Sequence, residues 1–342
     1  MLIYATADIH LSLAHEERLK NFKLFCQKAI EDGIQHIIIA GDLFDNDVDN
    51  TTLQAFDNLA QQFQSLTFHI IPGNHDISTD PNFFRNTNIK IYSSPQIVVL
   101  DNYTFVFVPY QEGQNMATYL YLLQEQLKDK SWTLISHGDY TGNSSSNIGE
   151  NESGYFPISK ADINFFHPTS IILGHIHQSY SPLNNLLYTG SLYPLNKGEI
   201  GIRRFIKIDT DSQTIDSENW ITNPIYEKLS LTLIPTNNTE DYCLRKIQDF
   251  LNTQAEGRNN LYLFLYLNGY TYNKNELSDI FDRLKTQLSL QGELIDTTKI
   301  TTKNEFENIL NLFEEKIQQL ETIPEISKKD ILNACEDLIY GN

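Results

Sequence analysis

The sequence predicts an α/β fold, in which a two-sheet β-sandwich flanked by helices is followed by a small α+β domain and C-terminal helices. In the first half of the chain, short apolar runs alternate with amphipathic stretches, an order that favours parallel strands with crossover helices. Further strand-like runs follow, in sufficient number for a second sheet. Near Pro224 this alternation stops, and a new series of strand-like and helix-like segments begins. We therefore expect domains at residues 1–220, 221–300 and 301–342.

Periodicity identifies the elements of the first domain. Residues 15–32 and 52–66 each place apolar side chains on one helical stripe, as amphipathic helices do. We expect strands at residues 2–8, 36–42, 68–76, 97–100, 104–110, 132–139, 170–177, 186–191 and 203–209. Residues 141–160 are rich in Gly, Ser and Asn and predict a long loop.

The rest of the chain alternates in the same way over shorter spans. We expect strands at residues 226–235, 261–270 and 293–298, and helices at residues 239–253 and 275–289. From Lys303 onward two amphipathic helices are expected, with apolar stripes at Phe306, Ile309, Leu310, Phe313, Ile317 and Leu320, and at Ile331, Leu332, Cys335, Leu338 and Ile339. Packing within the chain and docking on a partner explain these stripes equally well.

Composition limits the class of protein. Of the 342 residues, 40% are hydrophobic and 11% aromatic, which suits a globular protein with a core. No apolar run approaches the roughly 18 residues that span a bilayer, so no membrane association is expected. The N-terminus, MLIYATADIH, lacks the basic region of a signal peptide, and three distant cysteines favour a cytoplasmic setting. The net charge of −19 opposes a basic nucleic-acid surface but does not exclude one.

Five of the expected strands end in polar clusters of one kind. The clusters are Asp8-Ile9-His10, Gly41-Asp42, Gly73-Asn74-His75-Asp76, His137-Gly138-Asp139 and Gly174-His175-Ile176-His177. Ligands of open α/β folds bind at the carboxyl ends of strands, and residues i and i+2 of an extended chain project to the same side. Oxygen and imidazole donors without thiolate suit Mn²⁺, Fe or Zn²⁺ better than Ca²⁺. Seven ligands are too many for one tetrahedral ion, but they suit two ions that share a bridging carboxylate such as Asp42.

The succession D-x-H, G-D-x-x-D, G-N-H-D, a lone His before Gly, and G-H-x-H resembles the calcineurin-like metallophosphoesterase superfamily. The resemblance implies one ion held by Asp8, His10, Asp42 and His177, and a second held by Asp42, Asn74, His137 and His175. It also implies that His75 protonates the leaving oxygen or stabilises phosphate charge. Asp76 would orient His75, or alternatively cap a helix after the turn. Two divalent ions are the expected cofactors, with Mn²⁺ favoured and Mg²⁺ the alternative.

Two further stretches, GDLFDND at residues 41–47 and LLYTGSLYPLNKGEIG at residues 186–201, resemble the bacterial and phage SbcD-type nuclease subunits. That resemblance implies a metal-dependent DNA exo/endonuclease of DNA repair or recombination. Its expected partners are DNA, an SbcC-type coiled-coil ABC ATPase and a second copy of the chain. Residues 221–300 would form a DNA-facing cap domain, and residues 301–342 would dock the ATPase.

A small-molecule phosphodiesterase or phosphatase of the same superfamily is the alternative function. The candidate DNA contacts are Arg203, Arg204 and Lys207 on one strand, although a solvated strand face explains them equally well. Asp45 stands where archaeal and eukaryotic relatives often carry a His that contacts phosphate. Because of the acidic charge, we expect the lone chain to bind duplex DNA weakly and the ATPase partner to supply much of the affinity.

Overall fold

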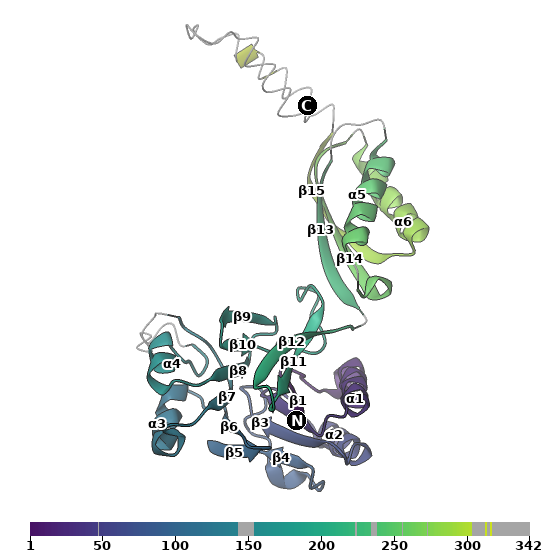
Figure 1. Cartoon of the computed structure of the whole chain (residues 1–342). Coiled ribbons are helices and arrows are strands. Elements are labelled where there is room, and N and C mark those ends of the chain that lie inside the picture. Colours follow the sequence, from purple (N-terminus) through teal and green to yellow (C-terminus); the bar gives the residue numbers. More distant parts are fainter. Residues whose placement is uncertain are drawn as a thin grey trace, which may run out of the picture. The chain divides into compact units, whose positions relative to one another are not determined.

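The structure, a computed structural model, describes most of the chain as two compact units. It describes residues 1–302 except 47, 143–153, 223, 234–237, 255 and 272, together with residues 312, 315 and 316. The two units are Met1–Thr222 and Asn223–Asn342 (Figure 1). The expected C-terminal helices and their docking role lie outside the described residues, apart from three positions. Within the described residues, no helix is long and apolar enough to cross a membrane.

The first unit contains two six-stranded mixed sheets. In the first sheet the order is β12 (Thr214–Trp220), β11 (Arg203–Asp209), β1 (Leu2–Thr6), β2 (His36–Ala40), β3 (Thr67–Ile71) and β4 (Ile89–Ile91). In the second it is β5 (Gln96–Leu100), β6 (Tyr103–Val108), β7 (Trp132–His137), β8 (Ser170–Gly174), β10 (Leu186–Tyr188) and β9 (Tyr180–Leu183). The strands β1 to β4 pair in parallel, as do β6, β7, β8 and β10, whereas β11, β12, β5 and β9 add antiparallel edges.

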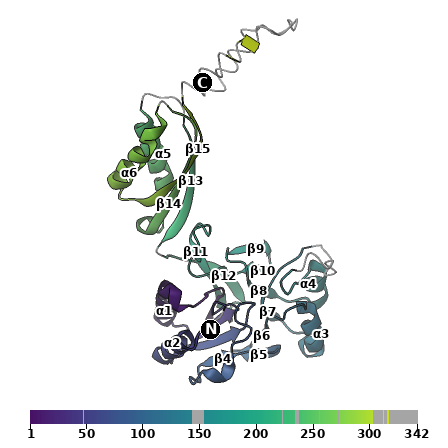
Figure 2. The same cartoon turned by 180° about the vertical axis from the view of Figure 1, so that it is seen from behind.

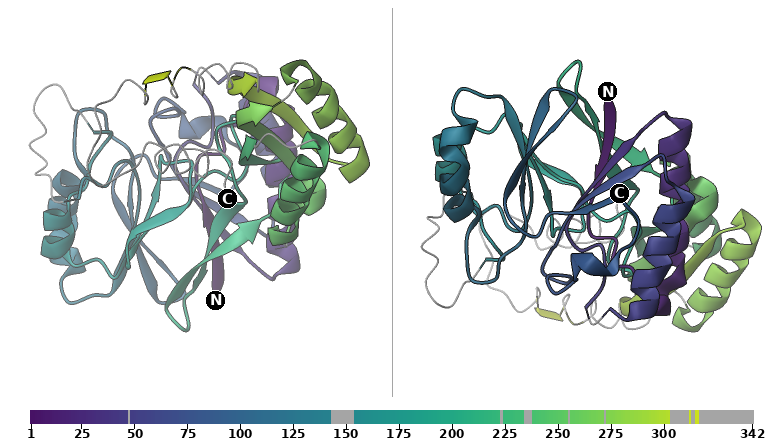
Figure 3. Two further views of the ribbon diagram at one scale, coloured as in Figure 1. Left: turned by 90° about the horizontal axis from the view of Figure 1, so that it is seen from above. Right: turned by 90° about the horizontal axis from the view of Figure 1, so that it is seen from below.

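Helices cover the outer face of each sheet, which completes a four-layer unit (Figures 2 and 3). The helices are α1 (Glu16–Glu31) and α2 (Asn50–Gln62) on the first sheet, and α3 (Met116–Leu127) and α4 (Lys160–Phe166) on the second. Between the sheets lie buried side chains such as Ile3, Ile38, Phe105, Ile135 and Ile172. Because the central strands are buried on both faces, their sequences are continuous apolar runs. The predicted α/β two-sheet fold is confirmed.

Local signals account for the helix ends. The side chain of Asp49 accepts a hydrogen bond from Thr52 N (2.7 Å), so α2 begins two residues before the predicted helix. A capping box of Ser159 and Asp162 begins α4. Gly33, with a φ of +74°, follows the end of α1 and is compatible with the left-handed backbone there.

The sequence did not predict three edge strands, β4, β9 and β12. With three residues, β4 is too short to show a period, and β12 reads TIDSENW, a polar sequence. These strands form because a neighbouring edge offers backbone hydrogen bonds, as β11 does along the whole of β12. Edge strands need few apolar side chains, which explains their weak sequence signal.

The second unit is a three-stranded parallel sheet with two helices on one face (Figure 1). Its elements are β13 (Ile225–Leu233), α5 (Thr239–Thr253), β14 (Leu261–Thr271), α6 (Leu277–Leu288) and β15 (Gln291–Thr302). Leucines from β13 and β14 pack on the helices around Ile247 and Phe281. Short 3₁₀ helices lie at η1 (Leu13–His15), η2 (Pro81–Phe83), η3 (Arg258–Asn260) and η4 (Lys274–Glu276).

Candidate dimetal site

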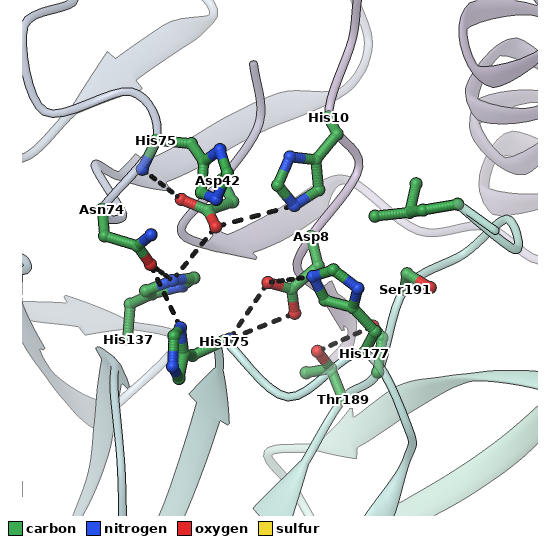
Figure 4. Close-up of polar contacts among 12 residues, drawn as sticks. Asp8, His10, Asp42, Asn74, His75, His137, His175, His177, Thr189 and Ser191 are labelled. Carbon is green, nitrogen blue, oxygen red and sulfur yellow. Dashed lines mark hydrogen bonds and ion pairs between the residues drawn. The ribbon is translucent and has the colours of Figure 1, made fainter. Parts of the chain in front are cut away.

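The structure brings all seven predicted metal ligands together. They follow the carboxyl ends of β1, β2 and β3 in one sheet and of β7 and β8 in the other, and they form one cluster (Figure 4). Its members are Asp8, His10, Asp42, Asn74, His137, His175 and His177. Asp8, Asp42 and His137 are almost completely withdrawn from water. The fold therefore gathers ionisable groups at the junction of its two sheets.

The backbone that carries these ligands is strained. Asp8, His10 and Asp42 have φ values of +52°, +50° and +51°, and His175 has a φ of +93°. A left-handed conformation costs a non-glycine residue about 1–2 kcal/mol. Hydrogen bonds hold the strained segments, because the backbone N–H groups of Ile9 and His10 both donate to Asp42 O (2.9 and 3.0 Å). Strain of this kind clusters at functional sites, and here it falls on four predicted ligands.

Glycine allows the backbone to approach His137 closely. A Cβ added at Gly41, where φ is +92°, would lie 2.1 Å from Nδ1 of His137. A Cβ at Gly174 would lie 2.2 Å from Ala40 O and 2.7 Å from the same nitrogen. Real Cβ atoms do not make such contacts, so both positions require glycine if His137 is to keep its place.

Replacing Gly41 by alanine is expected to lower the free energy of unfolding by about 2–5 kcal/mol. About 1–2 kcal/mol comes from the left-handed backbone and about 1–3 kcal/mol from displacing His137. Gly113→Ala is the matched control, because Gly113 also has a positive φ (+70°) but has no atom within 4 Å of its added Cβ. Denaturant unfolding measures both variants. Equal losses would show that the contact with His137 contributes nothing.

His137 shows why the cluster favours a cation. Its Nδ1 donates to the carbonyl oxygen of Ala40 (2.9 Å), so in the neutral ring Nε2 presents a lone pair. That lone pair faces two further acceptors, Oδ1 of Asn74 at 2.9 Å and Oδ2 of Asp42 at 3.3 Å. Burial alone would lower the pKa of His137, but the charges of Asp42 and Asp8 together with the hydrogen bonds of the ring outweigh burial and raise this pKa to about 9. Burial would raise the pKa of Asp42, yet the charge of His137 holds it well below its usual range. A proton or a metal ion at Nε2 would satisfy these converging acceptors.

Two groups of three possible metal ligands share Asp8. Ligand atoms of Asp8, His10 and His177 lie within 4.8 Å of one another, as do those of Asp8, Asp42 and His137. Burial lowers the pKa of His10 to about 4, so its ring is neutral at pH 7. Its Nε2 is buried, has no hydrogen-bond partner among the described residues, and lies 3.6 Å from Oδ2 of Asp42.

These observations fit two divalent ions. Burial raises the pKa of Asp8 to about 6, against the opposing charge of His137, so its carboxylate would gain from a cation nearby. Oδ2 of Asp42 faces His10 at 3.6 Å and His137 at 3.3 Å, which is where a bridging carboxylate is expected. Neutral imidazoles and carboxylates suit Mn²⁺, although the donor set does not select one metal. The assignment of each ligand to one ion or the other stays a prediction.

His75 lies beside the cluster, next to the carboxylate of Asp45. Its backbone N–H donates to Oδ1 of Asp42 (2.9 Å), and its ring packs edge-on against His10 with 4.6 Å between centroids. Its Nδ1 is buried and lies 3.5 Å from Oδ1 of Asp45. Arg18 holds Asp45 from the other side, because Nη1 donates to Oδ2 of Asp45 (3.2 Å) and to His10 O (2.8 Å). Asp45 is thus placed to orient the predicted general acid.

The structure corrects the role predicted for Asp76. Its carboxylate is almost fully buried: Oδ1 accepts from Gly73 N (2.6 Å), and Oδ2 accepts from Leu43 N (2.8 Å) and Phe44 N (3.2 Å). Asp76 therefore ties the turn after β3 to the segment after β2, and Asp45 is the carboxylate beside His75. Nor does Asp76 cap a helix, because η2 has Asp80 at its N-cap.

The prediction that Arg203 contacts DNA is wrong. Arg203 is 1% exposed, and its Nη1 pairs with Oε2 of Glu199 (3.2 Å). Its Nη2 donates to His177 O (2.9 Å), so the guanidinium supports the protein's own cluster. Arg204, next in β11, is exposed, and Lys207 pairs with Glu218 at 3.1 Å.

Sequence reasoning assigned no role to Glu199, although the segment 186–201 contains its G-E pair. Oε1 of Glu199 accepts from Nδ1 of His177 (2.9 Å). Burial would raise the pKa of Glu199, but the hydrogen bonds from His177 and Leu195 N, with the charges of His177 and Arg203, together outweigh burial and lower this pKa. Likewise burial would lower the pKa of His177, but the hydrogen bond to Glu199 and the charges of Asp8, Glu199 and Asp42 together raise it.

Comparison with known proteins identifies the family. The profile of the calcineurin-like phosphoesterase family matches residues 1–179, a range that contains all seven predicted ligands. A protein of Invertebrate iridescent virus 6 named "Putative phosphoesterase 244L" is 24% identical over 205 residues, which cover 56% of this chain and 70% of that protein.

Solved structures of low sequence identity are also similar to this chain. The protein TT1561 of Thermus thermophilus has 14% identity and a TM-score of 0.43, covering 64% of this chain and 98% of that one. A dimetal phosphatase from Danio rerio has 10% identity and a TM-score of 0.42, covering 60% and 91%. Because the family profile matches more than half of the chain and includes every strand-end motif, the chain belongs to the calcineurin-like phosphoesterase family and is a metal-dependent phosphoesterase.

Proposed function

We propose that the chain hydrolyses phosphodiester bonds of small substrates with two divalent metal ions, Mn²⁺ being the favoured metal. One observation carries the proposal. Acceptor atoms of Asp42, Asn74 and His137 face one another with Asp42 and His137 buried, so a proton or a cation is needed between them. The ring of His75 lies beside this group, against His10. When bound, the ions would neutralise phosphate charge and lower the pKa of the attacking water.

The chain's own residues supply a proton donor, His75, and a carboxylate that orients its ring, Asp45. Nδ1 of His75 faces Asp45 at 3.5 Å, which leaves Nε2 of His75 to face the substrate. Arg18 neutralises Asp45 and holds it in place. We infer that His75 donates a proton from Nε2 to the leaving oxygen as the ester bond breaks. General acid catalysis of this kind contributes roughly 10²–10⁴-fold to the rate.

The charge of the chain supports a small substrate over a polymer. A net charge of −19 repels a polyanion, and one of the three candidate DNA contacts is buried in an ion pair. A small diester needs to approach only the cluster itself, where the bound ions would carry the local positive charge.

DNA hydrolysis by an SbcD-type nuclease is a second candidate, favoured by one feature of the second unit. On the sheet face opposite α5 and α6, Tyr226, Tyr262 and Phe264 lie with ring centroids 5.3–5.7 Å apart. On the same face, Nζ of Lys228 lies 4.2 Å from the ring of Tyr266. Aromatic rings with a nearby cation are typical of surfaces that bind single-stranded nucleic acid. An SbcC-type ATPase partner and a homodimer stay predictions that belong to this candidate.

The test is a substrate panel assayed with the purified full chain. A 4-nitrophenyl phosphodiester, the corresponding phosphomonoester, linear duplex DNA and single-stranded DNA are each incubated with Mn²⁺, and again with excess chelator. We expect turnover of the diester, with loss of activity in chelator and recovery when Mn²⁺ is restored. Mn²⁺ at 100 times its dissociation constant should also stabilise the fold by about 2.7 kcal/mol for each ion bound.

Each outcome decides between the candidates. Diester hydrolysis without DNA cleavage supports the small-substrate proposal, and efficient DNA degradation replaces it with the second candidate. Turnover of the monoester alone would contradict the assignment to diesters. Full activity in excess chelator would contradict the metal-dependent mechanism itself.

A further inference from the structure

Three residues close around His177. Oε1 of Glu199 accepts from Nδ1 of the His177 ring (2.9 Å), and Oε2 accepts from Oγ of Ser191 (3.2 Å) and Nη1 of Arg203 (3.2 Å). Nη2 of Arg203 then donates to the backbone oxygen of His177 (2.9 Å). We call Ser191, Glu199 and Arg203 the Glu199 clasp. It holds both the ring and the backbone of His177, a predicted metal ligand. Figure 4 shows His177 and Ser191 beside the cluster.

The clasp determines which nitrogen of His177 faces the cluster. An ionised carboxylate can only accept hydrogen bonds, so in the neutral ring Nδ1 of His177 carries the hydrogen and Nε2 has the lone pair. Nε2 lies 4.0 Å from Oδ1 of Asp8, within the triad that also includes His10. Without the acceptor at Glu199, the hydrogen could move to Nε2 or the ring could turn. Either change would remove the lone pair from the triad.

Burial keeps the clasp in one arrangement. The Arg203 side chain is 1% exposed and that of Glu199 11%. The backbone N–H of Leu195 adds a further donor to Oε2 of Glu199, at 3.0 Å. If Glu199 turned away, the buried charge of Arg203 would lose its partner, which is strongly unfavourable. The carboxylate is therefore held in place from behind and presents Oε1 to His177.

We propose that Glu199 is a positioning residue that sets the affinity of one of the two metal positions, the one that includes Asp8, His10 and His177. It acts through the orientation of the His177 ring and the place of its hydrogen. Histidines that bind metals commonly donate their other N–H to a carboxylate, and losing that partner costs about 10–100-fold in affinity. The inference rests only on the metal-binding part of the proposed function.

Isothermal titration of Mn²⁺ into the metal-free full chain tests the proposal. Two binding events are expected for the wild type. In Glu199→Asp, which keeps a negative charge for Arg203 but is one methylene shorter, one event should weaken by about 10–100-fold and the other should stay unchanged. Glu199→Gln should show the same pattern. Both oxygens of Glu199 accept hydrogen bonds, so the N–H₂ group of the glutamine would face a donor of either His177 or Ser191 and Arg203. Glu218→Gln is the control, since Glu218 is a half-exposed carboxylate that pairs with Lys207, and it should leave both events unchanged.

A second readout separates positioning from simple structural support. Ring ¹⁵N shifts of metal-free protein, assigned by the signal missing in His177→Gln, report which nitrogen carries the hydrogen. The wild type should show His177 with its hydrogen on Nδ1, and Glu199→Asp should lose that preference. Ser191→Ala removes one donor to Glu199 and should give a smaller loss at the same metal position. This variant decides the question if both Glu199 variants fail to fold.

Two results would overturn the proposal. One is a folded Glu199→Asp protein that binds both Mn²⁺ ions with wild-type affinity. The other is an equal weakening of both events, which would indicate general disruption of the cluster. A chain that shows the expected loss at one position but hydrolyses no phosphodiester would contradict the proposed function and leave this inference standing.

Discussion

Asp42→Asn is expected to abolish tight binding of Mn²⁺ and to lower kcat/KM by more than the roughly 10–100-fold that follows from losing an outer partner of a metal ligand. Asp42 faces His10 and His137 with one oxygen, and with the other it accepts the backbone N–H of His75 (2.9 Å). The amide removes the negative charge. It also turns an N–H₂ group toward either the imidazoles or the His75 N–H.

Asp57→Asn is the matched control for this prediction. Asp57 is also a buried carboxylate in a hydrogen-bonded loop contact, and its Oδ1 accepts from Arg85 N (3.2 Å), Asn86 N (3.3 Å) and the Asn86 side chain (2.7 Å). It lies in α2, away from the cluster. We expect it to cost about 1–3 kcal/mol of stability while Mn²⁺ binding and turnover stay at the wild-type level. Undiminished Mn²⁺ binding in Asp42→Asn would contradict the bridging role.

His75→Ala is expected to lower kcat by roughly 10²–10⁴-fold for a diester whose leaving group is an alkoxide. An alkoxide is a strong base and leaves slowly unless it is protonated. A 4-nitrophenolate leaves without a proton, so the loss should be much smaller for that ester. The measurement is kcat for both esters with wild type, His75→Ala and Asp45→Asn. Asp45→Asn should show the same dependence on the leaving group with a smaller loss, because His75 keeps its ring but loses its orienting charge.

The ratio of the two losses distinguishes the roles that sequence reasoning left open for His75. Equal losses for both esters would mean that His75 stabilises phosphate charge and does not protonate the leaving oxygen. His15→Ala is the control, because His15 is an exposed histidine that pairs with Glu17 at 3.2 Å and lies outside the cluster. It should change neither rate constant.

Much of the site could be predicted because its ligands follow strands with a clear signal. Buried parallel strands are continuous apolar runs, and the polar residues directly after them must lie at one edge of a sheet. Asp8 with His10, and His175 with His177, therefore follow the ends of β1 and β8 at this edge, although the chain there is not extended as predicted, because Asp8, His10 and His175 have positive φ values. The edge strands β4, β9 and β12 lack such a signal. They are held by backbone hydrogen bonds to a neighbouring strand, and this pairing does not require apolar side chains of their own.

The residues that sequence reasoning misjudged are those whose roles depend on a partner distant in the chain. Arg203 looked like part of a solvated basic strand, but Glu199 neutralises it in the interior. Asp76, adjacent to His75, looked like its orienting carboxylate, whereas its oxygens bind backbone N–H groups across a turn.

The sequence by itself determined the α/β class, the strand-end motifs and the donor chemistry that suits two divalent ions. These follow from short-range rules, namely apolar periodicity and the preference of metals for particular donor atoms. Only the tertiary structure decided that Asp45 faces His75, that Glu199 fixes His177 and that Arg203 is buried. The physical reason is that a charged side chain can be buried only where an opposite charge pairs with it. That opposite charge is supplied by the packing of distant segments.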